Sequence, residues 1–294
     1  MKFLESGILL IDKPYQWTSN DVLRKIKSKY NFNKIGHAGT LDPLATGILP
    51  ILINNSTKYF DYFQNFKKSY LTEIKFGFST KTYDLEGDID GKTETLPEKI
   101  ESIECALKNF IGSIDQIPPK YSAIKKGGKR LYQYARNDEE IEIKSRKVDV
   151  SDIKIISWEK PVLKLIIKCS SGFYVRSFAN DLARKLKTLG VLISLSRVNY
   201  GPFDIKDSLR IENIYDLENR MLSIDSILSS NPKLNFDFET EKSYLNGGVF
   251  TSQNLNLNLL NDEDIKIYNN NDVFIGLLTF DKVKKFWKPK NIIK

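Results

Sequence analysis

The sequence has little of the residue types that most metal and cofactor sites require. Its 294 residues include one His and two Cys. One His excludes an HExxH or multi-His metal site, and two distant Cys exclude a zinc ribbon or an iron–sulfur cluster held by this chain alone. Neither GxGxxG nor GxxxxGK[ST] is present. We therefore expect any chemistry to depend on Asp, Tyr, Lys and Arg side chains, without a cofactor and without a metal.

Long hydrophobic runs are also missing. The longest, residues 7–11 and 47–53, fall far short of the roughly 18–20 residues that span a bilayer. The first residues include Glu5 and only a short apolar stretch, which makes a poor secretory signal. Cys105 and Cys169 are too few and too far apart for a disulfide scaffold. These features predict a cytoplasmic protein with no membrane partner.

Positive charge is in excess, because 45 Lys and Arg against 37 Asp and Glu leave a net charge of +8. A basic protein favours a polyanionic partner, although basic surfaces also serve solubility. Residues 120–136 contain six basic residues, no acidic one, and Tyr121, Tyr132 and Tyr134 between them. Cations neutralise phosphates and aromatic rings stack on unpaired bases, so this segment predicts RNA binding. The alternative is a solvated loop whose tyrosines enter the core.

Apolar spacing predicts mixed secondary structure. Alternation over residues 70–78 predicts a half-buried strand, and helical spacing recurs later in the chain. Strands and helices do not alternate strictly, which favours an α+β fold with a mostly antiparallel sheet flanked by helices. We predict a catalytic domain over 1–235, with an RNA-binding insertion at 120–136, and a small β-rich domain over 236–294. Further strands are expected at 7–12, 141–150, 162–169, 192–198, 265–268 and 273–280, and helices at about 19–30, 100–110 and 176–187.

Residues 36–47 are a tightly turning segment with three Gly and one Pro. Asp42 stands there between Leu41 and Pro43, and a partly desolvated carboxylate is a candidate nucleophile or base. An Asx-turn that only organises the loop is the alternative. His37 either contacts a phosphate or bonds to the backbone.

Two further residues have a structural and a functional interpretation. Arg176 falls near a predicted helix start, where the dipole disfavours a cation, so we expect a specific carboxylate partner. A surface ion pair with Asp181 or Glu73 is the alternative. Tyr70 is either a core residue of its strand or part of a site.

The acidic residues of 80–90 lack the spacing of an EF-hand, and we interpret them as a solvated turn.

Several ordered blocks between residues 7 and 203 resemble the TruB family of tRNA pseudouridine-55 synthases, in its bacterial stand-alone form. The GxLDPxATG pattern is the most specific of them. The C-terminal residues match weakly, so a PUA-like domain there rests on position and size. The blocks are GILLIDKP with the following TSNDVLRKIK, GHAGTLDPLATGILP, KSYLTEIKFGFSTKTYDLEGD, QIPPKYSAIKKGGKRLYQYAR, CSSGFYVRSFANDL and LSRVNYGPF.

The resemblance implies roles for individual residues. Asp42 corresponds to the catalytic aspartate, Tyr70 to the ring that stacks on the target base, and Arg176 to the partner of the aspartate. Tyr174 lies in the same block as Arg176, Leu195 corresponds to an apolar residue of the base pocket, and His37 to a residue that holds the flipped RNA loop. The predicted substrate-binding residues are His37, Tyr174, Leu195, Lys13, Lys125, Lys126, Lys129 and Arg130.

The implied reaction is the isomerisation of a uridine in the T-loop of tRNA. It breaks a C–N bond and forms a C–C bond without a redox step, which agrees with the missing cofactor motifs. We expect tRNA as the partner, with no guide RNA and no obligate protein partner. The alternatives are a non-catalytic RNA-binding or tRNA-folding protein, a guide-dependent synthase, and a glycosidase. The last is disfavoured because no second carboxylate is paired with Asp42 by motif.

Overall fold

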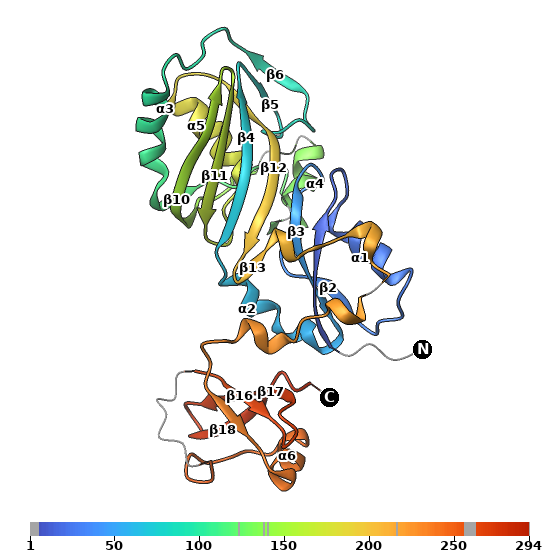
Figure 1. Ribbon diagram of the computed structural model, residues 1–294. Coiled ribbons are helices and arrows are strands. Elements are labelled where there is room, and N and C mark those ends of the chain that lie inside the picture. Colours follow the sequence, from blue (N-terminus) through green and yellow to red (C-terminus); the bar gives the residue numbers. More distant parts are fainter. Residues whose placement is uncertain are drawn as a thin grey trace.

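The computed structural model describes residues 6–122, 124–137, 139, 141–215, 217–255 and 263–293. Within them, the largest element is a ten-stranded sheet in the order β14-β1-β3-β12-β4-β11-β10-β7, with β2 beside β3 and β13 beside β12 (Figure 1). Its strands are β1 (Gly7–Lys13), β2 (Ile35–His37), β3 (Thr46–Ile53), β4 (Lys68–Phe76), β7 (Gly112–Gln116), β10 (Arg146–Glu159), β11 (Val162–Cys169), β12 (Gly190–Tyr200), β13 (Phe203–Asp204) and β14 (Leu209–Arg210).

Most neighbours in this sheet are antiparallel, and the parallel pairs are β1 with β14 and β3 with β12. The short β3–β12 pairing joins the two halves of the sheet through Ser196 opposite Thr46 and Arg197 opposite Gly47. On β4 the predicted alternation is present, since Ile74 and Phe76 are buried while Lys75 is exposed. The predicted α+β fold with a mostly antiparallel sheet is confirmed.

Helices lie beside both halves of the sheet. In Figure 1, α3 and α5 lie together beside β4, β11 and β10, and α1 lies near β1 and β2. Helix α5 buries Phe178 and Leu182, four residues apart, against this part of the sheet. A capping box between Thr18 and Asp21 begins α1. The helices are α1 (Ser19–Lys27), α2 (Phe60–Gln64), α3 (Ile100–Leu107), α4 (Leu131–Arg136), α5 (Val175–Lys185) and α6 (Phe238–Leu245). No helix in the described ranges is long and apolar enough to cross a bilayer.

Two short hairpins stand outside the large sheet. One joins β5 (Phe78–Thr80) to β6 (Ile89–Lys92), and the other joins β8 (Lys125–Lys126) to β9 (Lys129–Arg130). The strand predicted at 141–150 is wrong in its bounds. β10 begins at Arg146 and continues to Glu159, because its first part pairs with β7 and its second with β11. Residues 141–145 have no strand partner among the described residues and are mostly exposed.

The C-terminal residues form a separate small sheet in the order β15-β16-β17-β18, with α6 beside it. Its strands are β15 (Lys233–Asn235), β16 (Ile265–Tyr268), β17 (Phe274–Asp281) and β18 (Phe286–Lys290). Because β15 pairs with β16, we propose to place the domain boundary before Lys233 rather than after residue 235. Tyr59 packs in one apolar cluster with Phe274, and its hydroxyl donates to the Asn291 carbonyl at 2.8 Å.

Candidate active site

Asp42 lies in the loop between β2 and β3, and the start of α1 holds this loop in place. The Ser19 hydroxyl accepts from the Leu41 amide at 2.9 Å and donates to the Leu41 carbonyl at 3.2 Å. The Ala45 amide donates to the Asp42 carbonyl at 3.0 Å, which closes a turn. Gly47 then enters β3 with a φ of +100°, and a Cβ there would lie 2.3 Å from the Arg197 carbonyl oxygen. Glycine is therefore required where the loop joins β12.

Lys13 supports the same loop from inside the protein. Its side chain is fully buried, and Nζ donates to the carbonyls of Pro14, Trp17 and Pro43. Burial lowers the pKa of this ammonium to about 8, and the negative charge of Asp42 acts in the opposite direction. Lys13 was predicted as a substrate-binding residue, and the structure places its ammonium among backbone carbonyls and outside the lining of the cavity described below. Lys13 instead fixes the residue that follows Asp42.

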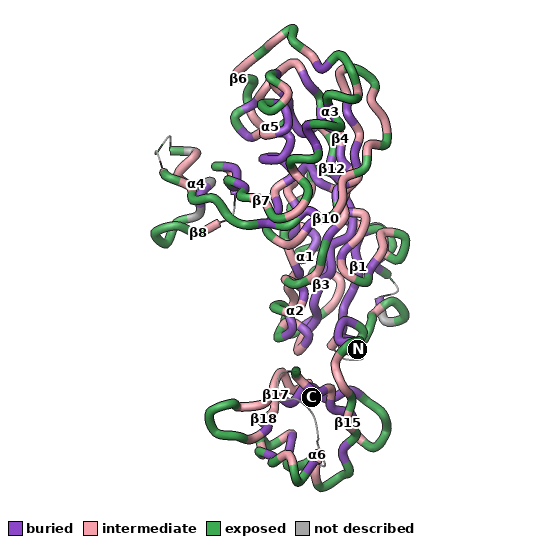
Figure 2. The backbone as a smooth tube through the Cα atoms, turned by 90° about the vertical axis from the view of Figure 1, so that its left-hand side faces the viewer, coloured by how far each residue is buried: buried purple, intermediate pink, exposed green. Residues whose placement is uncertain are grey.

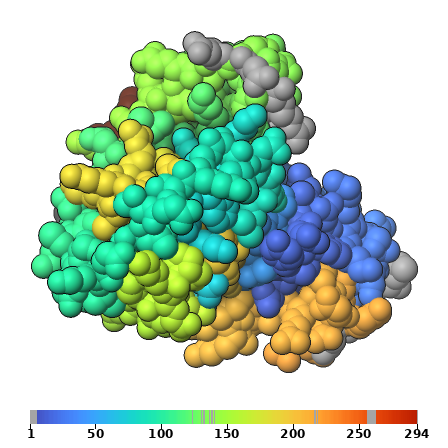
Figure 3. Space-filling view, turned by 90° about the horizontal axis from the view of Figure 1, so that it is seen from above, coloured from blue at the N-terminus to red at the C-terminus, as the bar shows by residue number. Residues whose placement is uncertain are grey.

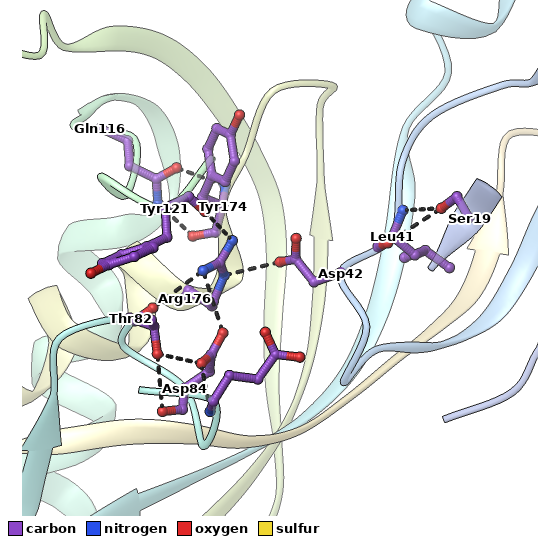
Figure 4. A network of polar contacts seen from close by, with 10 residues as sticks. Ser19, Leu41, Asp42, Thr82, Asp84, Gln116, Tyr121, Tyr174 and Arg176 are labelled. Atoms are coloured by element: carbon purple, nitrogen blue, oxygen red, sulfur yellow. Dashed lines mark hydrogen bonds and ion pairs between the residues drawn. The ribbon is translucent and has the colours of Figure 1, made fainter. Parts of the chain in front are cut away.

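Arg176 connects the β2–β3 loop to two other segments. The residue is 5 % exposed, and its Nε forms an ion pair with an Asp42 carboxylate oxygen at 2.9 Å. Nη2 donates to the Tyr121 carbonyl at 3.0 Å and Nη1 to the Thr82 carbonyl at 3.3 Å (Figure 4). The expected carboxylate partner near the start of α5 is thus Asp42, and Glu73 pairs instead with Lys164.

A second carboxylate, that of Asp84, lies on the other side of Arg176. Asp84 is fully buried, and its Oδ2 lies 3.3 Å from Arg176 Nη1. Its Oδ1 accepts from the Thr82 hydroxyl and from the Glu86 amide at 2.9 Å. Burial raises the pKa of Asp84, while the bond from Thr82 and the charge of Arg176 partly offset this. The interpretation of residues 80–90 as a solvated turn is therefore wrong at Asp84.

A cavity of about 350 Å³ opens beside this network. Five predicted site residues line it, namely Asp42, Tyr70, Tyr174, Arg176 and Leu195. They come from the β2–β3 loop, β4, the start of α5 and β12. The Asp42 side chain is 35 % exposed, so its carboxylate reaches the opening while Arg176 stays buried.

Two of the tyrosines that line the cavity, Tyr70 and Tyr174, are held by different contacts. Tyr174 precedes α5, and its amide and carbonyl bond to the Gln116 side chain at 2.8 and 3.0 Å. Burial raises the pKa of the Tyr70 hydroxyl, and a hydrogen bond with the Arg197 side chain acts in the opposite direction. Arg197 is itself held by the Ile48 carbonyl at 2.8 Å. These contacts hold the backbone of Tyr174 and the hydroxyl of Tyr70 at the cavity.

The predicted RNA-binding residues lie outside this cavity. The β8–β9 hairpin turns at Gly127 and Gly128, both with positive φ, and projects from the body with α4 (Figure 2). Figure 3 shows this light-green segment along one edge of the molecule. Lys125, Lys126 and Lys129 are exposed. The side chain of Arg130 lies outside the described residues.

His37 lies at the end of β2, next to β3 and likewise outside the cavity lining. Burial lowers its pKa, and the charge of Arg197 adds to that effect.

Sequence reasoning missed Asp84, Gln116, Lys68 and Arg197. Lys68 could have been found, because it precedes Tyr70 by two residues and so shares its face of β4.

Comparison with known proteins identifies the family. Residues 27–175 match the family model described as "TruB family pseudouridylate synthase (N terminal domain)". A Clostridium kluyveri protein named tRNA pseudouridine synthase B is 39% identical over 274 residues, covering 92% of this chain and 94% of the relative. A Ureaplasma urealyticum protein of the same name is 45% identical over 226 residues, covering 75% of this chain and 97% of the relative.

Solved structures agree with the fold. A chain in the "Crystal Structure of a Cbf5-Nop10-Gar1 Complex" matches with a TM-score of 0.70 at 20% identity, covering 95% of this chain and 79% of that chain. A chain in the "Structure of H/ACA RNP bound to a substrate RNA containing 2'-deoxyuridine" matches with a TM-score of 0.70 at 18% identity, covering 99% and 85%. At these identities the similarity shows the fold alone. From the family model and the curated relatives, the chain belongs to the TruB family of pseudouridylate synthases.

Proposed function

We propose that this chain is a cytoplasmic, stand-alone tRNA pseudouridine synthase that isomerises the uridine at position 55 of the T-loop. The observation behind this proposal is the Asp42 carboxylate, ion-paired to a buried Arg176 at the mouth of a cavity lined by Tyr70, Tyr174 and Leu195. Membership of the family and the names of the curated relatives support the substrate. Assistance in tRNA folding fits the same surface and is compatible with catalysis.

The cavity requires a uridine that has left its stack. Extruding a base costs a few kcal/mol, and stacking on an aromatic ring returns about 1–3 kcal/mol. The Tyr70 ring on β4 and the Leu195 side chain on the neighbouring β12 supply such a face and an apolar wall. The flipped base then lies beside the carboxylate of Asp42.

Arg176 keeps that carboxylate ready for reaction. Its Nε lies 2.9 Å from an Asp42 carboxylate oxygen, and a buried guanidinium needs anions around it. Asp84 binds Arg176 through Nη1, so Arg176 is held on one side by Asp84 while it orients Asp42 toward the cavity. This orientation serves each route, whether Asp42 attacks the ribose, attacks the base or promotes elimination.

The direct test is tritium release from a tRNA transcript labelled at C5 of uridine. We expect release by the purified chain alone, with no guide RNA added. Release only after addition of a guide RNA would support a guide-dependent synthase, and binding without release would support a non-catalytic RNA-binding protein.

Replacing Tyr70 by Phe separates the ring from its hydroxyl. Stacking depends on the ring, so we expect the Kd for tRNA to stay within about threefold of wild type while turnover falls. Filter binding and single-turnover kinetics measure the two effects. A collapse of binding would show that the hydroxyl, and its bond to Arg197, matters more than the ring.

Replacing Lys125, Lys126 and Lys129 by Gln tests the β8–β9 hairpin as a tRNA-binding element. For every phosphate that a lysine no longer neutralises, the slope of log K against log salt should become shallower by about 0.7–0.9, and affinity should fall. The matched control is Lys99→Gln with Lys108→Gln and Lys185→Gln, because these exposed lysines lie around α3 and the end of α5. An unchanged salt slope in the hairpin variant would remove the hairpin from the RNA interface.

A further inference from the structure

Lys68 is a buried cation that the reaction outlined above does not use. It begins β4, is 5 % exposed and lines the same cavity as Asp42. Its Nζ has no hydrogen-bond partner among the residues that the structure describes. A buried donor without an acceptor costs free energy, and more so when it is charged. Such a group in a cavity wall calls for an acceptor that arrives with a ligand.

The surroundings of Lys68 add positive charge rather than removing it. Its Nζ lies 4.6 Å from the centre of the Tyr200 ring, and Arg197 lies over the same ring at 4.8 Å. The guanidinium of Arg197 bonds to neutral groups, namely the carbonyls of Ile48 and Gly39 and the Tyr70 hydroxyl. The carboxylates of Asp42 and Asp84 are both engaged with Arg176. The part of the cavity wall around Lys68 is therefore suited to a negatively charged group of a ligand.

The position of Lys68 decides which negatively charged group of an RNA can reach its ammonium. Lys68 and Tyr70 share one face of β4, two residues apart. The ammonium group therefore lies next to the ring that would stack on the base. Cys169 and Tyr200 lie opposite Lys68 on the neighbouring strands. A phosphodiester would have to lose most of its hydration to reach this wall. The planar carbonyl edge of a base fits beside it with less desolvation.

We propose that Lys68 donates to a carbonyl oxygen of the flipped uracil and stabilises the negative charge that the ring acquires when it leaves the ribose. This inference rests on the proposed function. The C1′–N1 bond breaks, and its electron pair stays on uracil and spreads onto O2 and O4. The ring turns, C5 bonds to C1′, the C5 proton passes to a base of the site, and N1 takes up a proton. Lys68 keeps its own proton throughout and acts as a fixed donor of the oxyanion-hole kind.

The test is Lys68→Met, which keeps length and removes charge. We expect the single-turnover rate to fall by about 10²-fold or more, while the Kd for tRNA stays within about threefold of wild type. Because the unpartnered charge is gone, the variant should unfold at the same or a higher temperature. The control is Lys75→Met, which removes an exposed charge from the same strand and should keep both rate and affinity.

The pH profile gives a readout that a purely structural role would not change. Burial lowers the pKa of Lys68 to about 8, whereas burial raises the pKa of the facing Tyr70 and Tyr200 hydroxyls and raises that of the Cys169 thiol to about 12. The Arg197 guanidinium is the other cation over the Tyr200 ring. The wild-type rate should therefore fall as pH rises through about 8, and Lys68→Met should lack this decline.

The outcomes separate this inference from the proposed function. No pseudouridine from the wild-type chain would overturn both. An active wild type with an equally active Lys68→Met would overturn the role of Lys68 alone. Weaker tRNA binding with an unchanged rate in Lys68→Met would assign the ammonium to an RNA phosphate and contradict stabilisation of the ring. Strong destabilisation of Lys68→Met would show a structural role instead.

Discussion

Replacing Asp42 by Asn should lower uridine isomerisation by at least about 10⁴-fold and leave the Kd for tRNA within about threefold of wild type. The amide has the size of the carboxylate but lacks its charge and its capacity as nucleophile or base. Arg176 would keep its contacts with Asp84 and with the Thr82 and Tyr121 carbonyls, so the fold should persist. Single-turnover assays by tritium release, with filter binding alongside, measure the two effects.

The matched control for this change is Asp88→Asn. Asp88 is exposed and lies in the same acidic segment as Asp84, outside the cavity lining. It should keep wild-type rate and affinity. Substantial pseudouridine formation by Asp42→Asn would contradict the assignment of Asp42 as the reacting carboxylate.

Replacing Arg176 by Met should have the second largest effect and should act on both stability and rate. Removing one partner of a buried ion pair leaves the buried Asp84 charge uncompensated, which destabilises a protein by about 3–5 kcal/mol. Isomerisation should fall by about 10²-fold or more, because Asp42 loses the cation that holds it. Urea denaturation and single-turnover kinetics measure these changes.

A double variant separates the two roles of Arg176. Adding Asp84→Asn to Arg176→Met removes the buried charge, so we expect part of the lost free energy of unfolding to return while the rate stays low. The loss of stability in Arg176→Met should also be smaller at acid pH, because burial raises the pKa of Asp84 and a protonated carboxyl carries no net charge. Simple additivity of the two changes in stability would contradict the coupling.

Asp42 and Arg176 were accessible from local features of the sequence. Asp42 lies between apolar residues and a proline in a glycine-rich loop, and Arg176 stands near a helix start, where the dipole disfavours a cation and implies a carboxylate partner. The site roles of Tyr70, Tyr174 and Leu195 came from the resemblance to the TruB family. The sequence did not show that a second carboxylate, that of Asp84, lies on the other side of Arg176.

The burial of Asp84, Lys13 and Lys68 was not predicted, for one physical reason. Charged residues are seldom buried, so sequence reasoning places them on the surface. Asp84 is buried because its segment bridges to Leu192 on β12, more than a hundred residues later. Lys13 is buried because the chain turns at Pro14 and brings three carbonyls around one ammonium. The bridge of Asp84 to Leu192 and the bond of Lys13 to Pro43 join distant segments, and no local spacing encodes them. The limits of β10 were missed because its partners change from β7 to β11 along its length.

The central claim is that the cavity of Asp42, Arg176 and Tyr70 isomerises one uridine of tRNA without help from another RNA. Mapping of pseudouridine by carbodiimide modification and mass spectrometry, on a bare tRNA transcript incubated with the purified chain, tests it most directly. We predict a single pseudouridine at position 55 in the T-arm. A transcript that stays unmodified, or that is modified only after a guide RNA is added, would contradict the claim.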